Sequence, residues 1–344
     1  MAAPSTVAPI NQWLARTVEP ALEPDLPICD PHHHLWDGRA DRVEPRYFLD
    51  ELEADTGSGH DIVSTVFIEA RAMYRADPPM ELRPVGEVEF VQGIAAQSAS
   101  GMYSRTKAAH GIVGHANLHL GTEVRRVLEA LQAASPNRFK GIRHGVSWDP
   151  NPEIPIVGAY PMPDQLLSDD YRAGARVLAD MGLSLDVSLL HPQLPQLVDF
   201  ANAVPDLTIV LNHVGGLMRT GPYAANPDEV MANWRAGIAA AAQCSNVVIK
   251  LGGVGMPRLG YDFHRRETPV GSEELAAAID PVIRHCIEQF GPSRCMFESN
   301  FPVDKESFSY CVMWNAFKRM SADFSADERT DMFYGCAARA YRVG

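Results

Sequence analysis

Residues 28–37, with the sequence ICDPHHHLWD, join a short apolar run to three consecutive histidines. The side chains of an extended strand alternate between its two faces, so His32 and His34 would point to one side and His33 to the other. Two imidazoles on one face at the end of a strand can hold one metal ion or polarise one carbonyl oxygen. Short histidine motifs also occur in surface turns, so the weight of this interpretation depends on the rest of the chain.

Seven further segments have the composition of buried strands. Each is apolar, often rich in β-branched residues, and is followed by a segment with helical spacing or by a loop that leads into one. Eight such units are typical of a (β/α)8 barrel, whose parallel strands are covered by helices. An open doubly wound sheet would instead be favoured by a G-x-G-x-x-G turn after the first strand, which is missing. The expected strands are 28–32, 61–68, 112–118, 140–144, 183–190, 207–212, 246–251 and 295–298.

The sequence therefore predicts an α/β fold, a (β/α)8 TIM barrel that forms a single catalytic domain over residues 28–344. Residues 1–27, a mixture of Ala, Pro and Glu, are expected to form an N-terminal extension packed on this domain. The proline-rich segment 149–166 is too long for a simple connection and is expected to be a loop insertion at the C-terminal face of the barrel.

Composition limits the partners. No apolar run approaches the roughly 20 residues needed to cross a bilayer, and the first 20 residues show no basic segment followed by an apolar one. The net charge of −13 disfavours nucleic acid and anionic membranes. Six scattered cysteines without a C-x-x-C pair are typical of a reduced protein. We expect a cytoplasmic protein that acts on a small molecule. Whether it forms a homo-oligomer stays open.

Polar side chains gather where the predicted strands end. In a barrel of this kind all strand C-termini meet at one face, where active sites lie. A single histidine at a strand end is more often a core residue, but four or more together with carboxylates are hard to explain by packing. The residues at these ends are His32, His34, Glu69, Arg143, His144, His191, His213, Glu298, Asn300 and Asp304.

Six motifs, in this order along the chain, resemble those of the amidohydrolase superfamily, and specifically its amidohydrolase-related (amidohydrolase 2) branch. That branch contains sugar-acid and muconate-type lactonases, pyrone-dicarboxylate lactonase-like enzymes and non-oxidative decarboxylases. The resemblance extends from about residue 28 to the end of the chain. The motifs are DPHHHLWD at 30–37, GIRH at 141–144, HPQL at 191–194, LNHVGG at 211–216, VIKLGG at 248–253 and MFESNFPVD at 296–304.

The resemblance implies that His32 and His34 are metal ligands from strand one and that His191 is a ligand from strand five. His213 would act as an acid or base or polarise the substrate. A zinc ion held by three imidazoles keeps an open position, lowers the pKa of its water to about 7 and polarises an ester carbonyl. We expect the site to hold one divalent ion at most, with zinc as the first candidate. Some lactonases of this branch work without a metal, so a metal-independent site stays open.

One position departs from the family pattern. The family usually has Asp at the end of strand eight, in a Gly-Ser-Asp-Phe-Pro-like turn, whereas this chain has ESNFP at 298–302. Asparagine cannot take a proton from water at neutral pH. Glu298 could assume that role, Asp304 could reach in from the next loop, or no hydrolytic base remains. The candidate catalytic residues are therefore His213, Glu298, Asn300 and Asp304.

Arg143 is the first candidate for substrate binding, because a guanidinium at a strand end can bind a carboxylate through two hydrogen bonds. An ion pair with Glu69 or Glu298 is its structural alternative, and Glu298 could likewise pair with Lys250. Further substrate-binding candidates are His144, Lys250 and Tyr74.

The sequence thus predicts a hydrolase that opens a lactone or related cyclic ester of a small carboxylated compound in catabolism. A lyase on the same barrel site, either a non-oxidative decarboxylase or a hydratase, is the first alternative, and loss of the hydrolytic base would favour it. The second alternative, motivated by Asn300, is a non-catalytic binding protein on a degenerate barrel.

Overall fold

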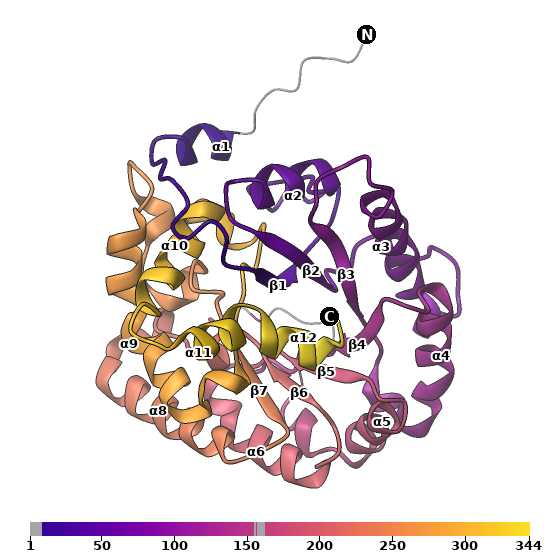
Figure 1. Cartoon of the computed structure of the whole chain (residues 1–344). Coiled ribbons are helices and arrows are strands. Elements are labelled where there is room, and N and C mark those ends of the chain that lie inside the picture. The colour runs from indigo at the N-terminus through magenta and orange to yellow at the C-terminus, as the bar shows by residue number, and fades with distance from the viewer. Residues whose placement is uncertain (1–8, 155, 157–161) are drawn as a thin grey trace.

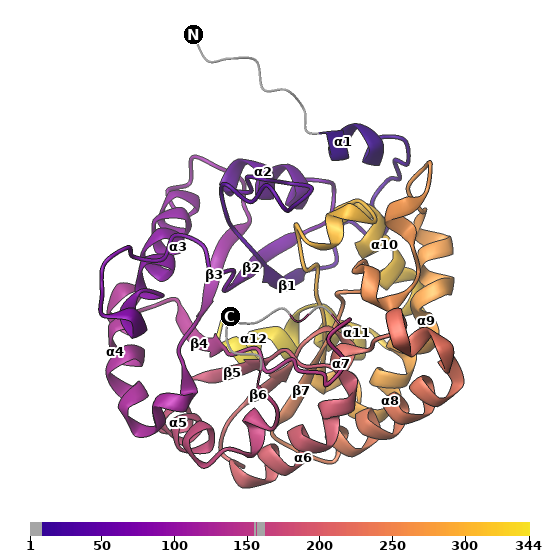
Figure 2. The same ribbon diagram turned by 180° about the vertical axis from the view of Figure 1, so that it is seen from behind.

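Eight strands form one all-parallel sheet in chain order in the computed structural model, which describes residues 9–154, 156 and 162–344 (Figures 1 and 2). The sheet curls into a nearly closed barrel, because Phe301 after β8 pairs with His33 of β1 and the Asn300 N–H donates to the His32 carbonyl at 2.9 Å. The predicted (β/α)8 barrel is confirmed. The strands are β1 (Ile28–His33), β2 (Ile62–Ile68), β3 (Lys107–Gly114), β4 (Phe139–Arg143), β5 (Ser184–Val187), β6 (Ile209–Leu211), β7 (Val247–Leu251) and β8 (Cys295–Phe297).

Helices surround the barrel (Figure 1). Their apolar residues recur at helical spacing on the side that faces the strands. In α4, for example, Val124, Val127, Leu128 and Leu131 are fully buried. Burying each of these side chains contributes about 1.5–3 kcal/mol. The helices are α1 (Pro9–Leu14), α2 (Leu49–Thr56), α3 (Val85–Ser98), α4 (Val124–Ala134), α5 (Asp169–Asp180), α6 (Leu194–Ala203), α7 (His213–Gly216), α8 (Pro227–Ala242), α9 (Ser272–Phe290), α10 (Tyr310–Met320), α11 (Ala326–Thr330) and α12 (Cys336–Tyr341).

β3 and β5 differ most from the sequence prediction, and the boundaries of the other strands agree to within two residues. β3 begins at Lys107, five residues before the expected 112, because pairing with β2 draws the weakly β-prone KAAHG segment into the sheet, with an irregularity at Ala109; it ends at Gly114 rather than at 118. β5 ends at Val187 rather than at 190, and the chain then turns outward into the short helix η4 (His191–Gln193).

The barrel interior contains a second apolar cluster, separate from the layer between strands and helices. The C-terminal helix α12 lies across the middle of the barrel in Figures 1 and 2 and contributes Tyr341, whose hydroxyl donates to Asp186 of β5 at 2.9 Å. The end of the chain therefore closes the interior and holds one of its charges. The cluster consists of Cys29, Val66, Ile68, Val113, Val210, Met296, Cys336, Ala337, Ala340, Tyr341 and Val343.

The described part of the expected N-terminal extension packs on the barrel. Trp13 donates to the carbonyl of Glu267 at 3.0 Å, and the Glu19 carboxylate accepts from the backbone N–H of Ser272 at 2.7 Å. Residues 1–8, and 155 and 157–161 of the expected insertion 149–166, lie outside the described residues. No helix in the described ranges is long and apolar enough to span a membrane.

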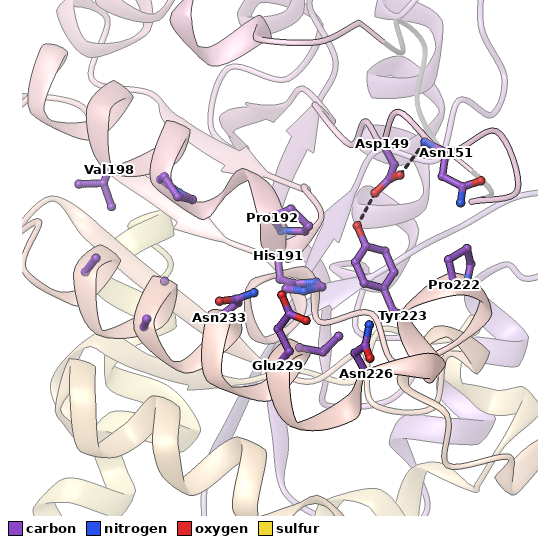
Figure 3. A pocket seen from close by; sticks show the side chains of 15 residues that line it. Asp149, Asn151, His191, Pro192, Val198, Pro222, Tyr223, Asn226, Glu229 and Asn233 are labelled. Carbon is purple, nitrogen blue, oxygen red and sulfur yellow. Dashed lines mark hydrogen bonds between the residues drawn. The ribbon is translucent and has the colours of Figure 1, made fainter.

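A hollow of about 900 Å³ lies on the flank of the barrel between α6 and α8 (Figure 3). Val198 of α6 and Glu229 and Asn233 of α8 line it, together with His191 and Tyr223 from the loops above. A second pocket, which we call the central pocket, lies at the strand ends. It shares no lining residue with the hollow on the flank.

Candidate active site

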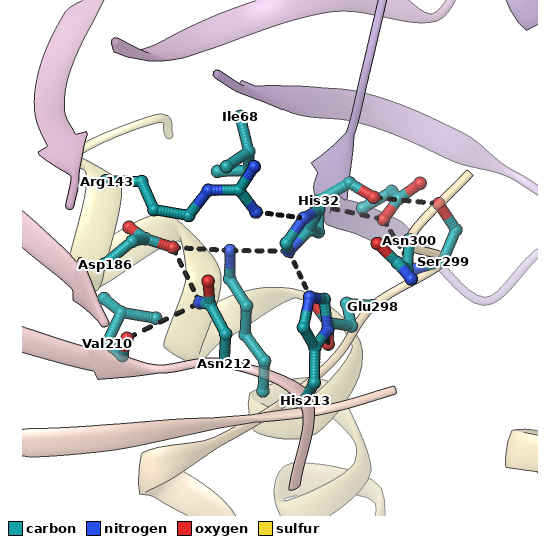
Figure 4. Close-up of polar contacts among 12 residues, drawn as sticks. His32, Ile68, Arg143, Asp186, Val210, Asn212, His213, Glu298, Ser299 and Asn300 are labelled. Atoms are coloured by element: carbon teal, nitrogen blue, oxygen red, sulfur yellow. Dashed lines mark hydrogen bonds and ion pairs between the residues drawn. The ribbon is translucent and has the colours of Figure 1, made fainter. Parts of the chain in front are cut away.

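The strand ends bring together side chains that lie far apart in the sequence (Figure 4). The register helps, since Arg143 at the end of β4 is paired with Asp186 of β5. Parallel strands that end at one face can place polar groups from several segments around one small volume. These groups are His32 and His34 from β1 and the residue after it, Arg143 from β4, Asp186 from β5, Asn212 and His213 after β6, Lys250 from β7 and Glu298 after β8.

His32 and His34 lie side by side, with their Nε2 atoms 3.3 Å apart. The Nδ1 atom of His34 is 2.8 Å from the carbonyl oxygen of Ile68. A carbonyl only accepts, so Nδ1 carries the hydrogen and Nε2 of His34 presents a lone pair. His33 is directed away from the pair and contacts the Thr65 hydroxyl at 2.9 Å. The structure thus brings the two expected imidazoles together on one face.

Glu298 lies between two histidines. Its Oε1 is 2.7 Å from Nδ1 of His213, and its Oε2 is 2.6 Å from Nδ1 of His32, although this second contact lacks hydrogen-bond geometry. Burial raises the pKa of Glu298 to about 8, while the nearby Lys250 opposes the rise. Burial also holds the pKa of His213 well below its usual value, so this imidazole is neutral. Its Nδ1–H can donate to ionised Glu298, which leaves Nε2 of His213 as a base.

The two glycines after β7 allow this packing. A Cβ atom at Gly252 would lie 2.3 Å from Cγ of Glu298, and one at Gly253 would lie 2.5 Å from Nδ1 of His213. Both distances are too short for any side chain. The Gly-Gly pair is therefore required by the contact between Glu298 and His213.

Lys250 is fully buried and forms an ion pair with Asp186 at 2.8 Å. Its Nζ is also 3.2 Å from Nδ1 of His32, and Asp186 accepts further hydrogen bonds from Tyr341 and Asn212. Lys250 thus contacts His32 from inside the barrel. That it also binds substrate remains a prediction. Asp186 was not recognised in the sequence, because a single aspartate inside an apolar strand has no motif that marks it.

Arg143 pairs with Glu69, as the structural alternative expected. Its Nε donates to the carboxylate at 2.9 Å, and Nη2 donates to the backbone carbonyl of the same residue. Its Nη1 is directed at Nε2 of His32, 3.4 Å away. The guanidinium therefore lies beside the histidine pair and still lines the central pocket, where it can contact a substrate.

Asp304 and Asn300 form a clip between two loops. The carboxylate of Asp304 accepts from Nδ2 of Asn300 at 2.7 Å and from the backbone N–H of Gly255 at 2.9 Å. Both of its oxygens are thus engaged, and burial raises its pKa well above the usual value. This arrangement favours Glu298 over Asp304 as the carboxylate that serves the histidines. Asn300 lines the pocket with its backbone in the left-handed region at φ 55°.

Three predicted residues are not brought to the histidine pair. His191 lies at the flank hollow, where its Nδ1 accepts from the N–H of Met218 at 3.4 Å and its ring contacts Tyr223 (Figure 3). The chain has already turned outward after β5, so the expected third ligand position is not filled by His191. His144 is buried, with Nδ1 accepting from the N–H of Leu118 at 3.2 Å. Tyr74 is half-buried in the loop after β2 and does not line the central pocket.

The central pocket, a cavity of about 170 Å³, opens above these groups. Arg258 in the short helix η6 (Pro257–Leu259) lines it, although nothing in the sequence of that glycine-rich loop singled this arginine out. The other polar or charged lining residues are His34, Trp36, Arg39, Arg42, Glu69, Arg71, His115, Arg143, Ser188 and Asn300.

The donor atoms fit one divalent metal ion. Two imidazole nitrogens on one tetrahedral zinc, each about 2.0–2.1 Å from it, lie roughly 3.3 Å apart. The Nε2 atoms of His32 and His34 have this separation of 3.3 Å. His32, His213 and Glu298 form a second donor set, with ligand atoms within 4.8 Å of one another. His32 could therefore hold an ion together with His34, or with His213 and Glu298.

Comparison with known proteins identifies relatives of the whole barrel. A family model described as amidohydrolase (Amidohydro_2) matches residues 29–343. A protein of Sinorhizobium fredii named "Uncharacterized protein y4mH" is 30% identical over 337 residues, which cover 93% of this chain and 99% of that protein. An L-fucono-1,5-lactonase of Burkholderia ambifaria is 25% identical over 289 residues, which cover 79% of this chain and 87% of that protein.

Among solved structures, an amidohydrolase from Burkholderia multivorans with bound zinc is similar in fold. The TM-score is 0.70 at 23% sequence identity, and the match covers 92% of this chain and 99% of that protein.

Proposed function

The chain belongs to the amidohydrolase 2 family, and from this premise we propose that it is a hydrolase that opens a lactone of a small carboxylated compound. One observation carries the proposal. A buried carboxylate, Glu298, contacts a neutral histidine, His213, next to the His32–His34 pair at the strand ends. A base and a group that polarises a carbonyl are the two components that ester hydrolysis requires. The relative named as an L-fucono-1,5-lactonase supports the choice of a lactone.

The base is the pair formed by His213 and Glu298. The Glu298 side chain is fully buried, whereas that of His213 is 7% exposed, so His213 is the member that a water molecule can reach. Nε2 of His213 takes a proton from the attacking water, and ionised Glu298, which accepts from Nδ1, stabilises the imidazolium that forms. The water oxygen then bonds to the ester carbon.

In this proposal the ester carbonyl oxygen accepts from Nη1 of Arg143, which lines the pocket, and from Nε2 of His32 behind it; these two nitrogens are 3.4 Å apart. Donors in this position stabilise the negative charge that develops on the oxygen. A divalent ion held by Nε2 of His32 and of His34 would replace the hydrogen bond from His32, polarise the carbonyl in its place and make the attacking water more acidic. When the ring carbon–oxygen bond breaks, His213 returns its proton to the alkoxide oxygen. The product is a hydroxy acid.

The test is a panel of aldonolactones and hydroxybenzoates, followed by pH change in weak buffer. We expect acid release with at least one lactone, since hydrolysis produces a carboxylic acid. His213→Asn should lower kcat by about 10²–10⁴-fold, the range for a lost general base. His285→Asn, a matched change at a half-buried position of α9 outside the pocket, should leave kcat unchanged. Alkalinisation with a benzoate in mildly acidic buffer, where the released CO₂ does not form bicarbonate, would identify a decarboxylase, and no change with any compound would favour a binding protein.

Metal content is a separate prediction. We expect about one divalent ion per chain in protein grown with zinc, measured by elemental analysis, and a loss of this ion in His32→Ala/His34→Ala. Chelation should lower the rate at least about tenfold, and added zinc should restore it, as expected when a metal supplies part of the carbonyl polarisation. Full activity of protein shown to be metal-free would contradict this prediction but not the assignment of His213 and Glu298.

A further inference from the structure

The central pocket is strongly cationic although the protein carries a net charge of −13. Glu69 is the only acidic residue among the described residues that line it. Positive groups concentrated in a pocket of an acidic protein are typical of a site for an anion. The lining arginines are Arg39, Arg42, Arg71, Arg143 and Arg258.

Arg258 differs from the lining arginines whose partners are defined. Arg143 is bound by Glu69, and Arg39 donates to the Asp41 carboxylate at 3.2 Å and to the Ala70 carbonyl at 3.1 Å. The Nε and Nη2 atoms of Arg258 are buried and have no hydrogen-bond partner. A buried donor without an acceptor costs free energy unless a ligand supplies one. The carboxylates of Asp304 and Glu298 act on Arg258 electrostatically, but its Nε and Nη2 have no acceptor and are available to an anionic group.

Arg143 and Arg258 reach the pocket from different strands of the barrel. Arg143 ends β4, whereas Arg258 follows β7, three strands further round an eight-stranded barrel. The histidine pair belongs to β1 and the residue after it, and His34 lines the same cavity as both arginines. A small molecule in this cavity can therefore place its reacting group at the histidines and Arg143 while a second group reaches Arg258.

We propose that Arg258 binds a carboxylate of the substrate that is separate from the ester that reacts. The planar guanidinium fork, with Nε and Nη2 both available, matches the two oxygens of a carboxylate. The substrate class is therefore a lactone that bears one anionic group apart from its ester, and its hydrolysis product is a dianion. This inference rests on the proposed function for the ester, but the anion site itself does not depend on turnover.

Calorimetric titration with simple carboxylates tests the site. The probes are the dicarboxylates from succinate to pimelate, the monocarboxylates of the same lengths, and inorganic phosphate. We expect one dicarboxylate length to bind wild-type protein at least about tenfold more tightly than its monocarboxylate partner. Arg258→Met should abolish this advantage and leave monocarboxylate affinity within about twofold, while Arg258→Lys should retain part of it. Arg265→Met, an exposed arginine outside the pocket, is the matched control.

Equal affinity for dicarboxylates and monocarboxylates would overturn the proposal, as would an equal loss for both in Arg258→Met. Phosphate that binds more tightly than every dicarboxylate, with the same dependence on Arg258, would overturn the carboxylate assignment. If Arg258→Met fails to fold in a thermal scan, Arg258→Lys decides, because only a direct contact predicts a selective loss of the dicarboxylate. Lack of lactone hydrolysis together with selective dicarboxylate binding would refute the proposed function and leave this anion site standing.

Discussion

Glu298→Gln is expected to lower kcat about 10³-fold, within the range for general acid–base catalysis, while the protein remains folded. Glutamine has nearly the volume of glutamate, and its amide oxygen can still accept from Nδ1 of His213. It carries no negative charge, however, so it cannot stabilise the imidazolium that forms when His213 takes a proton from water. The measurement is kcat and KM for the lactone identified in the panel, with circular dichroism as the check on folding.

The pH dependence gives this prediction a second readout. Burial raises the pKa of Glu298 to about 8, so the carboxylate is mostly protonated below that pH. Because the base requires the ionised form, kcat/KM of chelated wild-type protein should rise tenfold per pH unit and level off above about 8. Chelation matters here, since a dication beside His32 would lower the pKa of Glu298. In Glu298→Gln this rise of kcat/KM with pH should disappear.

Glu306→Gln is the matched control, because Glu306 lies in the short helix η9 (Asp304–Glu306) after β8 and does not line the pocket. Its rate and pH profile should equal those of the wild type. A rise of kcat/KM up to about pH 8 that persists in Glu298→Gln would contradict the assignment of this ionisation to Glu298. So would a larger loss of kcat in Asp304→Asn than in Glu298→Gln, which would transfer the role of base to Asp304.

The barrel could be predicted because its strands are buried on both faces and each leaves a local apolar signal. The predicted start of β3 was five residues too late along the chain, since the KAAHG segment becomes a strand only through pairing with β2. The closure of the interior by α12 could not be predicted at all. The CAARAY segment has no local feature that distinguishes a helix inside the barrel from one on its surface.

The core of the candidate site could be anticipated for a geometric reason. His32, His213 and Glu298 lie at or just after strand ends, and in a parallel barrel these ends meet. His191 was expected beside them, but it follows the end of β5 by four residues, enough for the chain to turn to the flank. Asp186 and Arg258 were missed for opposite reasons. One is an isolated charge inside a strand, and the other is placed by the path of a loop that no local pattern defines.

Lys250→Met is expected to lower the free energy of unfolding by about 3–5 kcal/mol, the cost of removing one partner of a buried ion pair. Both side chains of the pair with Asp186 are fully buried. Removing the ammonium leaves the Asp186 carboxylate inside the barrel with only the hydrogen bonds from Tyr341 and Asn212. Those neutral donors satisfy its lone pairs but do not neutralise its charge. Equilibrium unfolding in urea at pH 7 measures the loss.

The double variant Lys250→Met/Asp186→Asn separates the charge effect from lost packing. With both charges removed, the amide of residue 186 can still bond to Tyr341 and Asn212, so most of the lost stability should return. Lys107→Met, at an exposed site, should change stability by no more than about 0.5 kcal/mol. A double variant as unstable as Lys250→Met would show that the packing of the lysine stem, not its charge, stabilises the interior. Because Lys250 also contacts His32, its ion pair would then no longer explain how that histidine is held.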